Sequence, residues 1–182
     1  METIRLASDT CNSFVTEVSQ ATGQDINRCY QCGNCTAGCP FTEFFDYPVS
    51  QIMRMIQTGQ REKALNSRAI WLCATCETCS TRCPCEIDVA DVMDGLRNIA
   101  YREKRFTEKD VHTFYDSFLT SVRNHGRIFE LEILARYNLK SGHLLTDADL
   151  GPKVMKQLHF LPKRIKGRED IARIFKRFME KE

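Results

Sequence analysis

The sequence has no apolar run of the roughly 18 to 20 residues needed to cross a bilayer, so we expect no transmembrane segment. Its first residues, Met-Glu-Thr-Ile-Arg-Leu, lack the basic start and apolar stretch of a secretory signal, and we expect a cytoplasmic protein. There is no G-x-G-x-x-G motif and no P-loop, and the four histidines are scattered, with no nucleophile or ligand pattern beside them. These absences argue against a catalytic site in this chain.

Cysteine, in contrast, is abundant: eight of the ten cysteines lie in two runs with the spacing C-x2-C-x2-C-x3-C-P. Three thiols at three-residue intervals on one short loop can surround a corner of an iron–sulfur cube, and the fourth precedes a proline where the chain turns away. The runs are Cys29, Cys32, Cys35 and Cys39, then Cys73, Cys76, Cys79 and Cys83. This pattern predicts two [4Fe-4S] clusters bound by these eight cysteines.

Two other uses of cysteine fit the sequence less well. Structural zinc favours two C-x2-C pairs about 15 to 20 residues apart or a mixture of Cys and His, whereas four cysteines crowd into each run and neither run contains a His. Disulfides require an oxidising compartment, which the N-terminus does not indicate.

The two runs resemble those of bacterial two-cluster ferredoxins, in which the fourth cysteine of each run binds the other cluster. The resemblance implies that Cys83 completes the first cluster and Cys39 the second. The expected ligand sets are Cys29, Cys32, Cys35 and Cys83 for cluster 1, and Cys73, Cys76, Cys79 and Cys39 for cluster 2. Of the two cysteines outside the runs, we expect Cys11 to be a buried free thiol. Cys85 raises an alternative register, but Cys83-Pro84 matches Cys39-Pro40 in the first run, so Cys83 remains the expected ligand.

The hydrophobic pattern is helical throughout. Apolar residues recur at intervals of three and four in segments 9–22, 48–58 and 88–104, and a charged helix is expected at 61–67. The 33 residues between Cys39 and Cys73 contain two helical patterns and no alternating strand pattern. We therefore expect an all-α fold: an alpha-helical ferredoxin core at 1–105 and a helical C-terminal extension at 106–182.

The C-terminal extension also has helical patterns. We expect a helix from Thr107, which with Asp110 resembles a capping arrangement, to about Gly126, and further helices at 128–137, 154–160 and 168–180. Residues 153–182 contain ten Lys or Arg against four Asp or Glu, which suits a solvated face, a face that docks on a partner, or a contact with nucleic acid or a membrane. The formal charge is +2, but two oxidised clusters with their thiolates bring it to about −2, so we expect no nucleic-acid partner.

The details around the runs resemble the C subunit of heterodisulfide reductase from methanogenic archaea. The similarity covers residues 25–105 most strongly and includes Ile70-Trp71-Leu72-Cys73 before the second run and Ile87-Asp88-Val89 after it. It implies a protein that passes electrons from a flavin-containing A subunit to a B subunit, which reduces the mixed disulfide of coenzymes M and B. It also implies association with a hydrogenase or formate dehydrogenase module and flavin-based electron bifurcation.

Alternatives remain in related classes. Iron–sulfur subunits of succinate dehydrogenase and fumarate reductase share the helical two-run core but add a [2Fe-2S] domain before it. Those of glycolate oxidase continue into cysteine-rich domains, whereas this sequence has no cysteine after Cys85. A zinc-stabilised adaptor or nucleic-acid-binding protein is the alternative of a different class. Potentials of such clusters span about −700 to +450 mV, so the sequence leaves the electron donor open.

Overall fold

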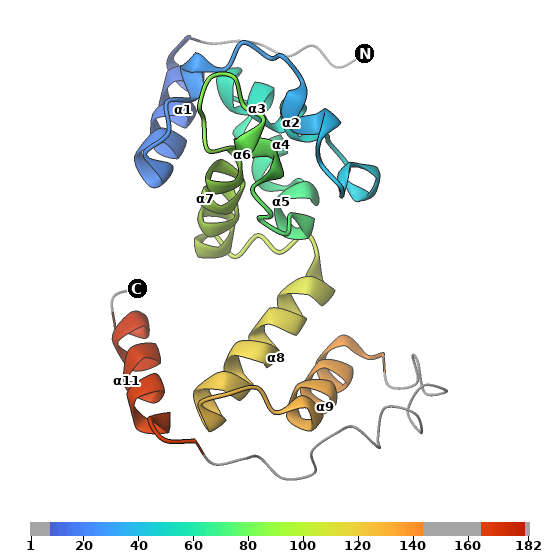
Figure 1. Cartoon of the computed structure of the whole chain (residues 1–182), viewed down its shortest axis with the longest axis vertical. Helices are drawn as coiled ribbons and strands as arrows, with labels where there is room; N and C mark the ends of the chain where they lie inside the picture. Colours follow the sequence, from blue (N-terminus) through green and yellow to red (C-terminus); the bar gives the residue numbers. More distant parts are fainter. Residues whose placement is uncertain (1–7, 144–164, 181–182) are drawn as a thin grey trace. The chain divides into compact units, whose positions relative to one another are not determined.

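The structure, a computed structural model, describes residues 8–143 and 165–180. The chain divides into two compact units, Met1–Glu108 and Lys109–Glu182. Within the described residues all regular elements are helices (Figure 1), and the expected all-α fold is confirmed. Residues 106–108, which we assigned to the C-terminal extension, are part of the first unit here. The division into a ferredoxin domain and a helical C-terminal extension stays a prediction.

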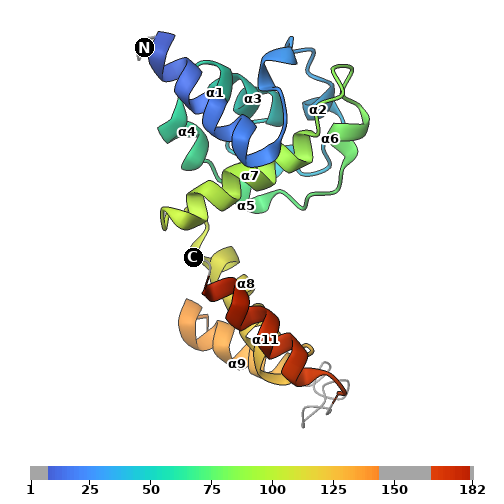
Figure 2. The same cartoon turned by 90° about the vertical axis from the view of Figure 1, so that its left-hand side faces the viewer.

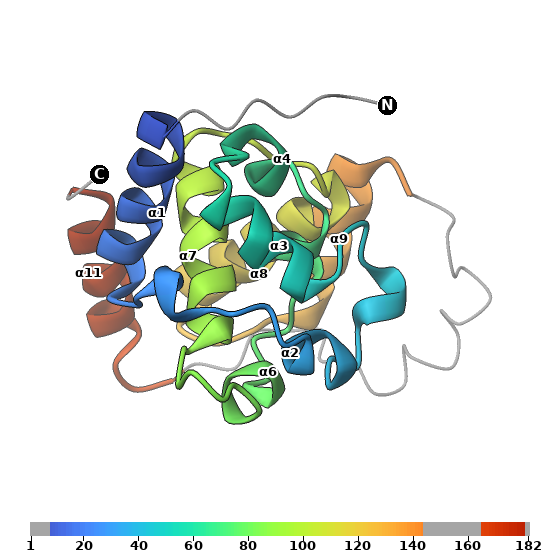
Figure 3. The same ribbon diagram turned by 90° about the horizontal axis from the view of Figure 1, so that it is seen from above.

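The core of the first unit lies between three helices, α1 (Ser8–Thr22), α3 (Val49–Gln57) and α7 (Val89–Arg102). Helix α1 packs on both α3 and α7, and Figure 3 shows α1 beside α7. The apolar residues that share one face of each helix are the ones that are buried, as their spacing predicted: Phe14, Val15, Val18, Val49, Ile52, Met53, Ile56, Val89, Val92, Met93, Leu96, Ile99 and Ala100. Burial of these faces, at roughly 25 cal/mol per Å² of apolar surface, is what stabilises the unit.

The first unit is built from two similar halves. Each half begins with a short helical segment that ends at the first cysteine of a run: η1 (Ile26–Arg28) before Cys29, and α5 (Ala69–Leu72) before Cys73. A one-turn helix follows within each run, α2 (Asn34–Ala37) or α6 (Thr78–Thr81), and then the long helix α3 or α7. In the first half, the 3-10 helix η2 (Thr42–Phe44) lies between the cysteine run and α3. In the second half, the described residues between the run and α7 contain no regular element. The sequence pattern did not identify α5.

A hydroxyl group on each one-turn helix holds the start of the following long helix. Thr36 on α2 accepts a hydrogen bond from the backbone N–H of Ser50 (2.9 Å), and Ser80 on α6 accepts one from the N–H of Ala90 (3.0 Å). A helix start has N–H groups without intrahelical partners, and these hydroxyls satisfy one at each long helix. The same bond at the same place in both halves ties each cysteine loop to the core.

Charged side chains join the remaining elements of the first unit. Arg61, at the start of α4 (Arg61–Leu65), forms ion pairs with Glu17 of α1 (2.8 Å) and with Glu103 just after α7, and these hydrogen bonds raise the pKa of its guanidinium. The Arg61 side chain is 29% exposed and also lies over the ring of Phe14, 5.9 Å from its centre. A network of this kind contributes more than an isolated surface pair, because each carboxylate is held by a preformed partner.

The second unit contains α8 (Lys109–His125), α9 (Glu130–Ser141) and α11 (Arg168–Met179), with α9 and α11 both in contact with α8 (Figure 2). The expected helix at 154–160 lies outside the described residues. Helix α8 begins at Lys109, two residues after Thr107, and the Thr107 hydroxyl donates to the carbonyl oxygen of Asn66 (3.1 Å). Helix α9 begins two residues later and ends four residues later than its pattern predicted.

The apolar stripe of α8 is less buried than its spacing indicates. Phe114, Tyr115 and Leu119 are 44 to 51% exposed, whereas Ser117 and Ser121 are fully buried. Ser121 is buried because its hydroxyl accepts a hydrogen bond from the N–H of Phe129, at the start of α9 (3.0 Å). This hydrogen bond compensates the burial of a polar residue at a position where hydrophobicity alone would place an apolar one.

Helix α7 passes α1 at Gly95, and the close approach generates a stability prediction. A Cβ atom at Gly95 would lie 2.3 Å from Cγ2 of Thr22, which is too close for any real pair of carbons. We expect Gly95→Ala to lower the free energy of unfolding by about 1 to 3 kcal/mol, the usual cost of overpacking. The gain from removing a helix glycine, about 1 kcal/mol, is smaller. Thermal unfolding of the anaerobically purified protein, followed by circular dichroism, measures the change.

The matched control is Thr22→Ser, which removes Cγ2 and keeps the hydroxyl that donates to the carbonyl of Val18 (2.8 Å). In that background Gly95→Ala should be neutral or stabilising. An equal loss of stability in both backgrounds would contradict the proposed contact.

Candidate iron–sulfur centres

Cysteines of both runs line one cavity in the first unit. Its walls include Cys29, Cys32 and Cys35 of the first run together with Cys83 of the second. The fourth cysteine of the second run thus lies with the first three of the other run, although the sequence separates it widely from them. This arrangement supports the predicted ligand set of cluster 1, which stays a prediction.

The second group of sulfurs also combines cysteines from both runs, here one from the first run with three from the second. Burial raises the pKa of the Cys73 thiol, and the neighbouring sulfurs of Cys39 and Cys76 act in the same direction. Burial likewise raises the pKa of Cys79 to about 11, and the sulfur of Cys73 adds to the increase. Cys39 of the first run is therefore an electrostatic neighbour of the second run's loop, as the predicted ligand set of cluster 2 requires.

The loop backbone has the same unusual conformation in both runs. The residues before and after the second cysteine have left-handed φ angles: Gln31 (65°) and Gly33 (81°) in the first run, and Thr75 (50°) and Glu77 (61°) in the second. Such angles are costly for residues other than glycine and persist only where the surroundings hold them. They turn successive N–H groups toward the inside of the loop, which creates the anion-binding concavity found at many iron–sulfur sites.

The sulfurs themselves fit a polynuclear metal group. Burial also raises the pKa of Cys29 and Cys35, and nearby thiolates add to the increase, while backbone N–H groups of Gln31 and Thr36 oppose it. Crowded thiols of this kind become anions together only when positive metal replaces their protons. In the part of the chain described here, no three His, Cys, Asp or Glu side chains are close enough to share a single ion. The thiolates of a cube are spread over its four corners.

Two side chains that the sequence analysis missed hold the first cysteine of each run. Gln57, the last residue of α3, donates from Nε2 to the carbonyl oxygens of Cys29 (2.7 Å) and Ile26 (3.2 Å). Arg97 of α7 donates to the carbonyl oxygens of Cys73 (2.6 Å) and Ile70 (2.8 Å). Aligning the starts of α3 and α7 would have identified both, because Gln57 and Arg97 are then equivalent.

Asp46 connects the two runs and was also missed. Its carboxylate accepts hydrogen bonds from the Ser67 hydroxyl (2.7 Å) and from the N–H groups of Arg68 (2.9 Å) and Ala69 (3.0 Å). Burial opposes ionisation, but these bonds outweigh it and lower the pKa of Asp46. The loop that follows the first run is thereby fixed to the start of α5, which leads into the second run.

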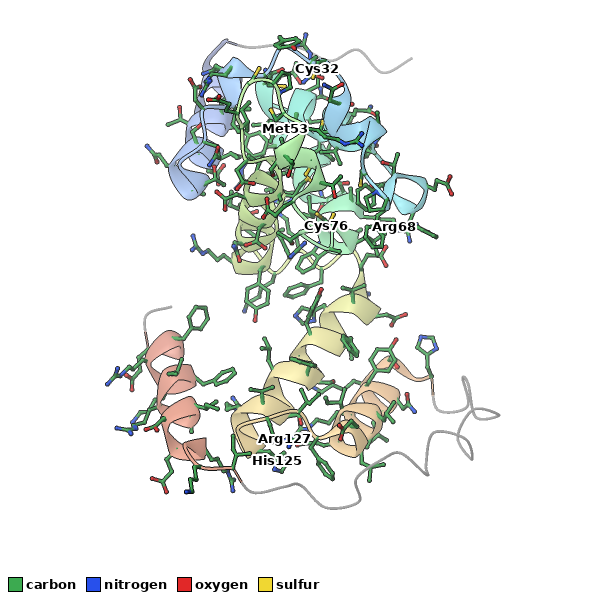
Figure 4. All side chains as sticks on the ribbon, in the orientation of Figure 1. Cys32, Met53, Arg68, Cys76, His125 and Arg127 are labelled. Atoms are coloured by element: carbon green, nitrogen blue, oxygen red, sulfur yellow. The ribbon has the colours of Figure 1, made fainter. Side chains whose placement is uncertain are left out.

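The remaining cysteines differ in their surroundings. Cys85 lines the same cavity as Cys83, and its Sγ donates to the carbonyl oxygen of Arg28 (2.9 Å). Cys11 belongs to α1, but its side chain is outside the described residues. Cys32 and Cys76 are the exposed members of the two runs, and Figure 4 shows them at separate places on the first unit.

Crossed ligation can be tested by substitution. If Cys39 binds the cluster of the Cys73 loop, Cys39→Ala should perturb the same cluster as Cys76→Ala, and Cys83→Ala the same cluster as Cys32→Ala. Low-temperature EPR of each variant, after reduction, identifies the affected cluster. Because each fourth ligand joins one run to the other, both Cys39→Ala and Cys83→Ala should also unfold at a lower temperature. Damage to one cluster by both Cys39→Ala and Cys32→Ala would show that ligation is local to each run.

Comparison with known proteins agrees with this geometry. A family model for a 4Fe-4S dicluster domain matches residues 25–87. The C subunit of the H2:CoB-CoM heterodisulfide,ferredoxin reductase of Methanothermobacter thermautotrophicus is 36% identical over 87 residues, which are 48% of this chain and 47% of that protein. The iron-sulfur C subunit of the CoB–CoM heterodisulfide reductase of Methanopyrus kandleri is 37% identical over 78 residues, 43% of this chain and 41% of that protein.

A longer match covers 73% of this chain and 60% of the relative. It is to the C2 subunit of the H2/formate:CoB-CoM heterodisulfide,ferredoxin reductase of Methanococcus maripaludis, with 29% identity over 133 residues. The match to the first relatives spans about half their length. In the described residues no helix has the length and apolar character to cross a membrane. Residues 25–87 thus form a 4Fe-4S dicluster domain that binds two [4Fe-4S] clusters and is homologous to that of the heterodisulfide reductase C subunits.

Proposed function

We propose that this chain is the electron-transfer subunit of a heterodisulfide reductase complex. It relays electrons from a flavin-containing A subunit to a B subunit that reduces the disulfide of coenzymes M and B. The observation that carries the proposal is the pairing of two cysteine groups in one small unit, in a chain whose relatives are named as the C subunits of such reductases. The name of the Methanococcus maripaludis relative supports a hydrogenase or formate dehydrogenase module as a further partner.

The residues around the two cysteine groups are suited to holding clusters that transfer electrons. When bound, the clusters supply one-electron oxidation and reduction at potentials set by their surroundings. The left-handed loops direct N–H groups at the sulfurs, and Gln57 and Arg97 fix the carbonyl of the first cysteine in each run. Since these contacts hold the cysteine loops against α3 and α7, we expect the loops to move little when the charge of a bound cluster changes.

The exposed cysteines suggest where partners meet the chain. Cys32 and Cys76 are exposed, whereas the other six cysteines of the runs are buried or half-buried. An electron donor and an acceptor that dock over these two loops would approach one cluster each. The separation of Cys32 and Cys76 on the surface leaves room for two partners (Figure 4).

Metal content gives the first test. We expect about eight iron and eight sulfide per chain in the anaerobically purified protein, the content of two cubes. Iron and acid-labile sulfide assays on the same sample measure both. About four of each, together with zinc, would contradict two equal clusters.

Activity and partners give the second test. We expect the isolated chain to show no reduction of the heterodisulfide with a reduced viologen dye as donor, and the chain combined with its A and B subunits to support it. Anaerobic co-purification from the native source should yield a flavoprotein and a cysteine-rich protein. Co-purification with a succinate- or glycolate-oxidising enzyme would replace this proposal with one of the alternative oxidoreductases. Turnover by the single chain at the rate of the complex would also refute it.

A further inference from the structure

Several equivalent pairs of residues differ in charge between the two halves of the first unit, and one of these pairs holds the first cysteine of each run. Helices α3 and α7 correspond at an offset of 40 residues, with Val49, Ile52, Met53 and Ile56 aligned with Val89, Val92, Met93 and Leu96, all of them buried. The next residue is Gln57 in α3 and Arg97 in α7. Both donate to the carbonyl of the first cysteine of a run and to that of the isoleucine three residues before it. The same support is therefore neutral in one half and positively charged in the other.

Hydrogen bonds to sulfur do not distinguish the halves in the same way. Nε2 of Gln31 lies 3.5 Å from Sγ of Cys29, and Oγ1 of Thr78 lies 3.4 Å from Sγ of Cys76. Each run thus has a polar side chain against one of its sulfurs. Because such bonds tune the potential of a cluster, their presence in both runs leaves the charge of Arg97 as the larger difference.

The charged residues beside Arg97 and Gln57, and the one next to Cys76, are more exposed than Arg97. The Arg97 side chain is 18% exposed, whereas its ion-pair partner Asp94 (3.1 Å) is 44% exposed. Glu77 in the second run and Arg54 beside Gln57 are exposed residues. Water and salt screen exposed charges strongly and partly buried charges much less, so the guanidinium of Arg97 is less screened than these three charges.

We propose that Arg97 raises the reduction potential of the cluster held by the Cys73 loop above that of the cluster held by the Cys29 loop. Reduction adds one negative charge to a cluster, and a nearby partly buried cation stabilises the reduced form. With both clusters bound, Arg97 would thus favour an added electron on the cluster held by the Cys73 loop over the cluster held by the Cys29 loop. Together with the proposed function, this order directs electrons from a donor near Cys32 to an acceptor near Cys76.

The variants Arg97→Gln and Arg97→Lys test the role of charge. Arg97→Gln gives the second half the side chain of the first, and should lower the midpoint potential of the second cluster while leaving the first unchanged. We expect at least a tenfold change in the ratio of reduced to oxidised cluster at a fixed solution potential, which is about 59 mV for one electron. Arg97→Lys keeps the charge and loses the forked geometry, so it should retain most of the difference.

Two further variants act as matched controls. Arg54→Gln removes an exposed cation that donates to Oε1 of Gln57 (3.4 Å), and should leave the potential of the second cluster unchanged. Asp94→Asn removes the anion paired with Arg97 and should raise the potential of the second cluster. Neither residue supports a cysteine carbonyl, so both variants are expected to fold with full iron content, and they test the proposal even if Arg97→Gln loses its cluster.

The measurement is a redox titration of the full chain with both clusters, followed by EPR. Cys32→Ala and Cys76→Ala identify which signal belongs to which loop. A lower potential at the Cys73 loop than at the Cys29 loop in the unaltered chain would overturn the proposal. So would unchanged potentials in both Arg97→Gln and Asp94→Asn with iron intact, or a shift limited to the first cluster. No partner protein is present in this experiment, so its result is independent of whether the chain acts in a heterodisulfide reductase.

Discussion

Mutual repulsion between thiolates is the constraint on which the first unit depends. Eight cysteines are gathered in two groups, and burial together with neighbouring sulfurs raises the pKa of Cys29, Cys35, Cys73 and Cys79. The free chain therefore favours protonated sulfur at these four positions, and iron binding has to replace those protons. The loops must hold their shape during this change, because a loop that relaxed would lose the concavity of N–H groups that receives the anionic cluster.

The shape of the loops is supported from outside the runs. Gln57 and Arg97 reach the first cysteines from α3 and α7, and the hydroxyls of Thr36 and Ser80 reach in the opposite direction, from the loops to the starts of those helices. Each loop is thus fixed at two points to a helix whose other face is buried in the core. Because α3 and α7 are held in place by packing with α1, these contacts also fix the positions of the cysteine sulfurs.

The sequence predicted the elements that depend on local pattern. Helices α3 and α7 were found because buried residues at intervals of three and four reveal a helix without knowledge of its neighbours. The eight cysteines were predicted as cluster ligands from their spacing. Gln57 and Arg97 were not identified, because a polar residue on a helix carries no signal of the carbonyl it will meet some 30 residues away. The internal repeat would have revealed them, but its two parts are not in register. The offset is 44 residues between the cysteine runs and 40 between the long helices, so an alignment of the runs does not pair Gln57 with Arg97.

An internally repeated fold presents a difficulty for directed electron transfer, since two equal halves would give two clusters of equal potential. In this chain the backbone of the two cysteine loops and their contacts with the long helices are the same in both halves, as the repeated φ angles and hydroxyl hydrogen bonds show. The halves differ instead at side chains on or beside the loops, such as Gly33 against Glu77 and Gln57 against Arg97. Substitution at the second of these pairs changes charge without changing backbone, because both side chains make the same hydrogen bonds to equivalent carbonyls. A direction of electron transfer can therefore arise in a repeated fold from a single charged residue. Arg97 can have this effect because its support of the loop needs no charge: the neutral Gln57 makes the equivalent hydrogen bonds in the other half.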